Sequence, residues 1–142
     1  MNAIQTNHRY NELFNKMTGV YRTIVKHYDM SECQFWILYA LTEEQKPLAQ
    51  SELMRYINAP KQTIHSAIHK LIDEKMIFLQ EINGKKKSYI LSQQGKELSE
   101  KTVQIVIQDE INVFEQFSEE ERNQFLSLTQ KYIELLESTG IK

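Results

Sequence analysis

Helical periodicity runs through nearly the whole chain and is interrupted once, at residues 76–91. Before and after this interval, apolar residues recur every three or four positions, as they do along one face of an α-helix. Within it, two short runs rich in β-branched and aromatic residues flank Asn83-Gly84, the strongest short signal for a β-hairpin. The pattern therefore predicts a mainly α-helical fold with one small hairpin, whose strands cover residues 76–81 and 87–91.

The composition excludes several other classes of protein. The 142 residues include only four glycines and two prolines, too few turn-forming residues for a many-stranded β fold. Cys33 is the single cysteine, which excludes an internal disulfide and fits a reducing compartment. No apolar run approaches the ~18 residues of a membrane span, and the first residues do not resemble a signal peptide. We therefore expect a cytoplasmic protein that has no membrane partner.

Four helices are expected before the hairpin. The first covers about residues 8–28 and is long and amphipathic. Ser31 and the glutamine three residues later form a capping-box pattern ahead of an apolar run, which predicts a central second helix. Pro47 is expected to open a short third helix and Pro60 a fourth, at residues 60–74, because the first turn of a helix tolerates proline.

Two further helices are expected after the hairpin. Ser92 is placed to cap a long helix at about residues 93–116, and Ser118 with Glu121 forms a second capping box for the last helix. The helices at both ends of the chain carry long apolar stripes, which need a partner if they are exposed. We therefore expect a homodimer formed through residues 1–30 and 93–142; a monomeric four-helix bundle is the competing explanation.

The order of these elements is that of a winged helix-turn-helix, which places a DNA-binding region at residues 31–92. The fourth helix is then the recognition helix. The side chains on its outward side can all donate a hydrogen bond, and none of them is acidic. An ordinary solvent-exposed face is the alternative interpretation. The outward positions are Lys61, Gln62, Thr63, His65, Ser66, His69 and Lys70.

The charge is distributed unevenly along the chain. Residues 46–96 contain nine basic and four acidic residues, a net charge of +5, whereas the flanking segments together carry −7. A basic centre is typical of a module that binds a polyanion. Lys85, Lys86 and Lys87 stand at the expected tip of the hairpin, where duplex DNA would neutralise their mutual repulsion. A solubilising lysine cluster on an exposed edge is the alternative.

These residues resemble the MarR family of bacterial transcription regulators over nearly the whole chain. The resemblance rests on the stretches around residues 34–38, 60–64, 71–77 and 83–87, and on Leu91-Ser92-Gln93-Gln94-Gly95 after the hairpin. It implies a homodimer with intertwined ends that binds palindromic operators in double-stranded DNA and usually represses transcription. In many members a small molecule or an oxidant releases the DNA.

The chain departs from the usual family pattern at several positions. The family's hairpin commonly carries an Asp and an Arg that pair, whereas this chain has Asn83 and lysines, so phosphate contacts are expected in place of base reading. Lys75 stands where a glycine often ends the recognition helix, which predicts a different helix exit or a left-handed residue. Ala49 stands at a usual Ser/Thr cap, and Ser51 is expected to face DNA.

A small-molecule effector is expected to bind between the dimerisation helices and the DNA-binding region. Residues that would line such a pocket share apolar or aromatic character, and the alternative is that they simply form the core. They are Tyr10, Phe14, Met17, Tyr21 and Trp36.

Other chemistry has little support. Cys33 has two interpretations, a redox trigger or a small buried side chain, and the second is preferred. His65 and His69 have the i, i+4 spacing of a helical metal site but no third ligand nearby, so no metal or other cofactor is expected. No phosphate-binding glycine loop or nucleophile motif is present, so the chain is not expected to be an enzyme.

A winged-helix module that binds an acidic protein surface, without direct DNA binding, is the alternative function.

Overall fold

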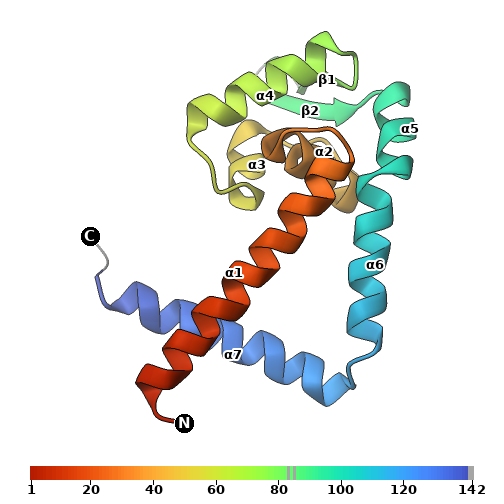
Figure 1. Ribbon diagram of the computed structural model, residues 1–142. Coiled ribbons are helices and arrows are strands. Elements are labelled where there is room, and N and C mark those ends of the chain that lie inside the picture. The colour runs from red at the N-terminus through yellow and green to blue at the C-terminus, as the bar shows by residue number, and fades with distance from the viewer. Residues whose placement is uncertain (83, 85, 141–142) are drawn as a thin grey trace. The chain divides into compact units, whose positions relative to one another are not determined.

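The computed structural model describes residues 1–82, 84 and 86–140. Helices dominate these residues, and the two strands form a single antiparallel hairpin (Figure 1). This confirms the mainly α fold with one hairpin. The elements are α1 (Ala3–His27), α2 (Glu32–Glu44), α3 (Gln50–Tyr56), α4 (Lys61–Asp73), β1 (Ile77–Ile82), β2 (Lys86–Leu91), α5 (Gln93–Lys101), α6 (Val103–Glu115) and α7 (Glu119–Ser138).

The chain divides into two compact units. The first covers Met1–Ile105 and contains α1 to α5, the hairpin and the start of α6. The second covers Val106–Lys142 and contains the rest of α6 and α7. None of the helices in the described residues is both long and apolar enough to cross a lipid bilayer.

The core of the first unit is built around α2. Phe35, Ile37 and Leu38 on α2 have no exposed surface, and neither have Ile64 and Ile68 on α4. Figure 1 shows α2, α3 and α4 gathered with the hairpin at one end of α1. Burying each such side chain contributes about 1.5–3 kcal/mol, so α2 anchors the elements that surround it, as its almost wholly apolar sequence predicts.

Serine caps fix the beginnings of three helices. The Ser31 Oγ accepts from the Gln34 amide at 3.1 Å, and the Ser92 Oγ accepts from the Gly95 amide at 3.0 Å. Ser118 caps α7 in the same way and forms the predicted capping box with Glu121. These three predicted caps are confirmed. At α1, Asn2 forms a further capping box with Gln5, so the helix begins five residues earlier than its apolar stripe indicates.

The prediction that Pro47 opens the third helix is wrong. Leu48 forms an isolated antiparallel bridge with Tyr89 of β2, with backbone N···O distances of 3.0 and 2.8 Å. This pairing requires extended backbone, so α3 begins only at Gln50. Pro60, for its part, is the N-cap of α4 and not its first residue.

A continuous helix at residues 93–116 is also wrong, because the chain breaks at Thr102. The backbone there has φ −131° and ψ −91°, which separates α5 from α6. The Thr102 hydroxyl donates to the Leu98 carbonyl oxygen at 2.8 Å. The same kind of bond is made by Thr18 and Thr23 within α1 and by Thr129 within α7, which are unbroken, so this bond accompanies the break and does not explain it.

The second unit turns at an aromatic cluster. The ring centroids of Phe114, Phe117 and Phe125 lie 5.7–6.3 Å apart in edge-on pairs. The Arg122 guanidinium donates to the carbonyl oxygens of Phe114 and Phe117 at 3.1 and 2.7 Å. These contacts hold the corner between α6 and α7, yet no residue of α7 is buried within this chain.

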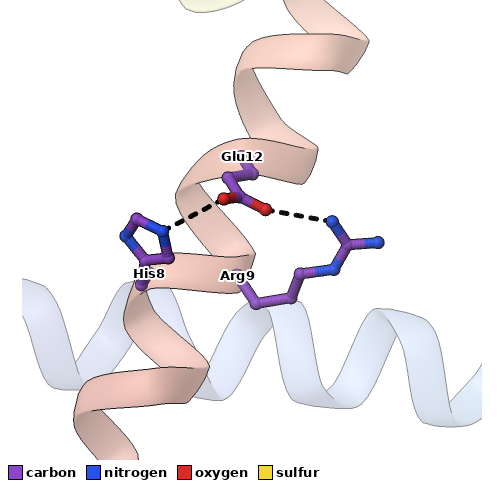
Figure 2. A network of polar contacts seen from close by, with 3 residues as sticks. All are labelled: His8, Arg9 and Glu12. Atoms are coloured by element: carbon purple, nitrogen blue, oxygen red, sulfur yellow. Dashed lines mark hydrogen bonds and ion pairs between the residues drawn. The ribbon is translucent and has the colours of Figure 1, made fainter.

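The outer surface of α1 carries a small polar network, shown in Figure 2. The Glu12 carboxylate contacts the His8 Nε2 and the Arg9 Nη1, both at 3.0 Å. More than half of each of these side chains is exposed. Exposed pairs of this kind contribute little to stability, so we interpret the network as a solvated helix face and not as a binding site.

Candidate nucleic-acid interface

One face of α4 is buried and the opposite face is exposed. Ile64, Ala67, Ile68 and Leu71 face the core and are at most 8% exposed. The hydrophobic face thus fixes which side chains point outward. All seven residues of α4 that are predicted to face DNA are exposed, namely Lys61, Gln62, Thr63, His65, Ser66, His69 and Lys70.

The beginning of α4 is free of acidic groups. Its N-cap is Pro60, which has no side-chain acceptor, and its first turn contains no Asp or Glu. The first amides of a helix have no partners within the helix, and they attract anions. The exposed face of α4 therefore combines hydrogen-bond donors, cations and a helix N-terminus, an arrangement that suits a phosphate backbone.

His65 and His69 lie next to each other on this face. Their ring centroids are 4.3 Å apart and their planes meet at 68°. Within the described part of the chain, no group of three or more His, Cys, Asp or Glu is placed to hold a metal ion. Both side chains are exposed on the outward face of α4.

Polar contacts hold α3 in place before α4. The side-chain Nε2 of Gln50 donates to the Lys61 backbone carbonyl oxygen at 3.5 Å, linking the beginnings of the two helices. The Tyr56 hydroxyl donates to the Glu44 carboxylate on α2. That hydrogen bond, together with burial and the negative charge, raises the pKa of Tyr56 to about 12. Ser51 is exposed at the start of α3, as a DNA-facing residue must be.

A left-handed residue connects α4 to the hairpin. Lys75 has φ +64°, which is the left-handed residue, the second of the two alternatives expected at this position. The Lys75 amide donates to the Ile72 carbonyl oxygen and the Met76 amide to the Leu71 carbonyl oxygen, both at 2.9 Å. These bonds end α4 firmly and fix where β1 begins relative to α4.

Only part of the predicted lysine cluster on the hairpin is placed. Lys87 is exposed and pairs in register with Glu81, and Lys86 lies in β2 opposite Ile82. Gly84 has φ +69°, which fits the predicted tight turn. Lys85 lies outside the described residues.

Two pairs of the predicted effector residues are in ring contact, and the first is Tyr10 with Phe14 on α1, whose ring centroids lie 6.2 Å apart. The rings of Tyr21 and Trp36 are 5.6 Å apart, and Trp36 also contacts Phe35 and Tyr39 on α2. Tyr10, Phe14 and Met17 are 43–51% exposed on α1. Cys33 is buried, and its burial raises the pKa of the thiol, which makes it less reactive.

The sequence pattern missed two contacts that position this interface. One is the hydrogen bond between Tyr56 and Glu44, which lie twelve residues apart on different helices. The other is the bridge between Leu48 and Tyr89, which joins the segment before α3 to β2. Neither contact has a local sequence signature. The hydrogen bond joins side chains of two different helices, and a single bridge lacks the alternating pattern that indicates a strand.

Comparison with known proteins identifies the fold. No protein-family profile matches the chain, and no curated protein matches it either. Solved structures do match. A MarR family regulator from Neisseria meningitidis superposes with a TM-score of 0.80 at 20% sequence identity, covering 98% of this chain and 96% of the other. The chain has the MarR fold.

Two further solved structures match the chain, and each is described with what that protein binds or is regulated by. One is the complex of S. aureus MepR with DNA, with a TM-score of 0.73, 20% identity and coverage of 96% of this chain and 99% of the other. The second is BpsR of Bordetella bronchiseptica, whose DNA binding is regulated by 6-hydroxynicotinic acid. It has a TM-score of 0.64 at 16% identity and covers 90% of this chain and 98% of that one.

Proposed function

We propose that this chain is a MarR-family transcriptional regulator that binds double-stranded DNA through α4 and the hairpin. The observation that carries the proposal is the exposed face of α4, where seven polar or basic side chains stand together without an acidic residue until Asp73. A solved complex with DNA of a protein with the same fold supports it. The structural neighbours of this chain are transcriptional regulators, so we propose no enzymatic activity for it.

We further propose a homodimer that binds palindromic operators. The apolar side chains of α7 are exposed in the single chain; Phe125, Leu128 and Leu135 retain 48%, 64% and 58% of their surface. Apolar surface of this extent favours association. A two-fold dimer presents two copies of α4 and therefore matches two half-sites related by the same symmetry. We also propose that the dimer represses transcription and that a small-molecule effector regulates its DNA binding, as 6-hydroxynicotinic acid regulates the DNA binding of BpsR.

The decisive experiment is a salt titration of duplex binding. The ligand is duplex DNA from upstream of the chain's own gene. Two subunits that contact six to ten phosphates lose on the order of a thousandfold in affinity between about 50 and about 200 mM salt. Lys87→Ala should weaken binding to all sequences alike and reduce the salt slope, whereas Lys131→Ala on α7 is the control and should do neither. If the duplex fails to bind at low salt, the proposal is refuted.

A second measurement tests the recognition helix. Gln62 is exposed in the first turn of α4, and a Gln side chain can bond bidentately to adenine. Gln62→Ala should therefore change which operator is preferred by about 1–3 kcal/mol per half-site. An unchanged preference would show that α4 does not read bases through this residue.

The alternative is a winged-helix module that binds an acidic protein surface. It has the same positive charge on residues 46–96 but no base reading. This alternative predicts that any duplex binds equally weakly, so a specific operator with an affinity at least a hundredfold above that of random DNA excludes it.

A further inference from the structure

Two of the four histidines of the chain lie in one row along the exposed face of α4. His65 and His69 are one helical turn apart, and their ring centroids lie 4.3 Å from each other. Lys61 precedes them in the same row with the same spacing, and Asp73 follows them. All four side chains are exposed. The row therefore presents two imidazole rings, in contact with each other, on the surface that is proposed to meet DNA.

The acidic groups of the elements around α4 do not pair with these rings. The helix packs against α2, α3 and β1. Most carboxylates on those elements have other contacts, namely Glu32 with Arg22, Glu44 with Tyr56, Glu52 with the Ala49 amide and Glu81 opposite Lys87. The other charged groups of these elements and of α4 are Glu43, Arg55, Lys61, Lys70, Asp73 and, at the C-cap, Glu74. Within the described residues, no carboxylate oxygen lies within 4.0 Å of a ring nitrogen of either histidine.

The charge of a histidine depends on pH in the neutral range. Histidine is the side chain that ordinarily gains or loses its charge between about pH 5 and about pH 8. A proton on His65 or His69 adds a positive charge that faces the duplex in the proposed complex. Because duplex DNA is a polyanion, the proton and the duplex should favour each other's binding to this face.

The two protonation states of an imidazole ring match different bases. The neutral ring has one donor and one acceptor nitrogen, whereas the protonated ring has two donors and no acceptor. In the major groove, guanine presents two acceptors, N7 and O6, whereas adenine presents the N7 acceptor and the N6 donor. A protonated ring therefore suits guanine and is opposed by the amino group of adenine, whereas a neutral ring suits either base.

We propose that His65 and His69 form a proton-dependent reader of guanine on α4. The proposal rests on the proposed function, and it adds a base preference that changes with pH. When a ring carries a proton, the chain selects guanine at the base that this ring contacts; when the ring is neutral, the selection is lost. The proton comes from the solvent, binds to a ring nitrogen and returns to the solvent as the pH rises.

The test is a selection from a pool of duplexes with a randomised core. The full chain binds the pool at low salt, at about pH 6 and at about pH 8, and the bound duplexes are sequenced. At about pH 6 we expect a guanine to be selected in each half-site. At about pH 8 its preference over adenine at that position should fall at least about fivefold, because the bidentate contact to guanine is lost.

Substitutions that fix the two states of the rings locate the effect. A glutamine side chain carries a donor and an acceptor and no charge, so the double variant His65→Gln, His69→Gln should have one base preference at both pH values. A lysine side chain has donors only and stays charged over this range, so His65→Lys should select guanine at both. Both positions are exposed, so we expect these variants to fold, and their thermal-unfolding midpoints check this.

The two other histidines provide the matched control. His8 and His27 lie on α1, and His8 contacts Glu12 (Figure 2). The double variant His8→Gln, His27→Gln removes as many imidazole rings as the variant on α4 does. It should keep the change of base preference between the two pH values.

Three results would overturn the proposal. The first is a base preference of the wild type that is the same at both pH values. The second is an equal change of affinity for all duplexes with pH, which would show that the rings contact phosphates and do not read bases. The third is loss of the pH effect in the α1 control. If no duplex binds at either pH, the proposed function fails together with this inference, whereas binding without a pH-dependent preference refutes the inference alone.

Discussion

Replacing Gly95 by alanine tests the packing of α5 against the start of the hairpin. A Cβ at this position would lie 1.9 Å from the Met76 carbonyl oxygen and 2.9 Å from its carbon, whereas ordinary contact begins near 3.4 Å. The two segments must therefore separate by about 1.5 Å. The same Met76 oxygen accepts from the Ser92 amide at 2.9 Å and from the Ser92 hydroxyl at 3.0 Å, and this hydroxyl shares its one proton with the Lys75 carbonyl oxygen at 2.5 Å.

The separation should cost more than alanine gains as a helix former. Overpacking costs about 1–3 kcal/mol, and two weakened hydrogen bonds cost about 0.5–1.5 kcal/mol each, while alanine gains about 1 kcal/mol over glycine in a helix. We expect Gly95→Ala to lower the free energy of unfolding by about 2–4 kcal/mol. Urea denaturation followed by circular dichroism, at matched protein concentration, measures this value.

Gly19 provides the matched control. It lies within α1, and a Cβ there would meet no atom within 4 Å. Gly19→Ala should therefore raise the free energy of unfolding by about 0.5–1 kcal/mol, because only the helix-propensity gain remains. A Gly95→Ala variant as stable as the wild type would show that α5 and the Met76 backbone can separate freely, and would refute the argument.

Three further predictions concern single residues. Lys75→Gly should raise the free energy of unfolding by about 1 kcal/mol, because glycine adopts φ +64° without strain; an unchanged urea midpoint would contradict this. Ala49→Ser should add about 0.5–1 kcal/mol by supplying the side-chain cap that α3 lacks, and amide exchange in the first turn of α3 should slow accordingly. The hydrogen bond to Glu44 raises the pKa of Tyr56 from 10.0 to about 12. The stability that this bond provides is therefore complete below pH 10 and is lost as the pH rises through about 12. The difference in phenolate absorbance between the wild type and Tyr56→Phe should titrate with a midpoint near 12, and a midpoint near 10 would exclude the bond.

Local signals made much of the fold predictable from the sequence. The caps at Ser31, Ser92 and Ser118 depend on residues three positions away, so they can be recognised without tertiary information. The outward face of α4 follows from the period of its buried residues. The Gly84 turn follows from the need for a positive φ.

Features that depend on distant residues were not predictable. The extended backbone at Leu48 exists because of Tyr89, 41 residues further along the chain, and this pairing displaced the expected start of α3. The break at Thr102 interrupts an apolar period that continues on both sides, so periodicity alone predicts one helix. A cavity of about 430 Å³ lies between the end of α2, the end of β2 and α5, and no single stretch of sequence indicates it because three separate segments line it.

The bridge between Leu48 and Tyr89 has a consequence for torsion in the proposed DNA complex. Two backbone hydrogen bonds join the segment that leads into α3 to the strand that carries Lys87, and the Met76 amide ties the start of β1 to the Leu71 carbonyl oxygen of α4. The hairpin is thus held to the helix-turn-helix on both strands, so the recognition helix and the hairpin cannot rotate independently. A rigid pair of contacts on one duplex fits only a narrow range of helical twist. Affinity for an operator should then depend on the supercoiling of the DNA as well as on its sequence.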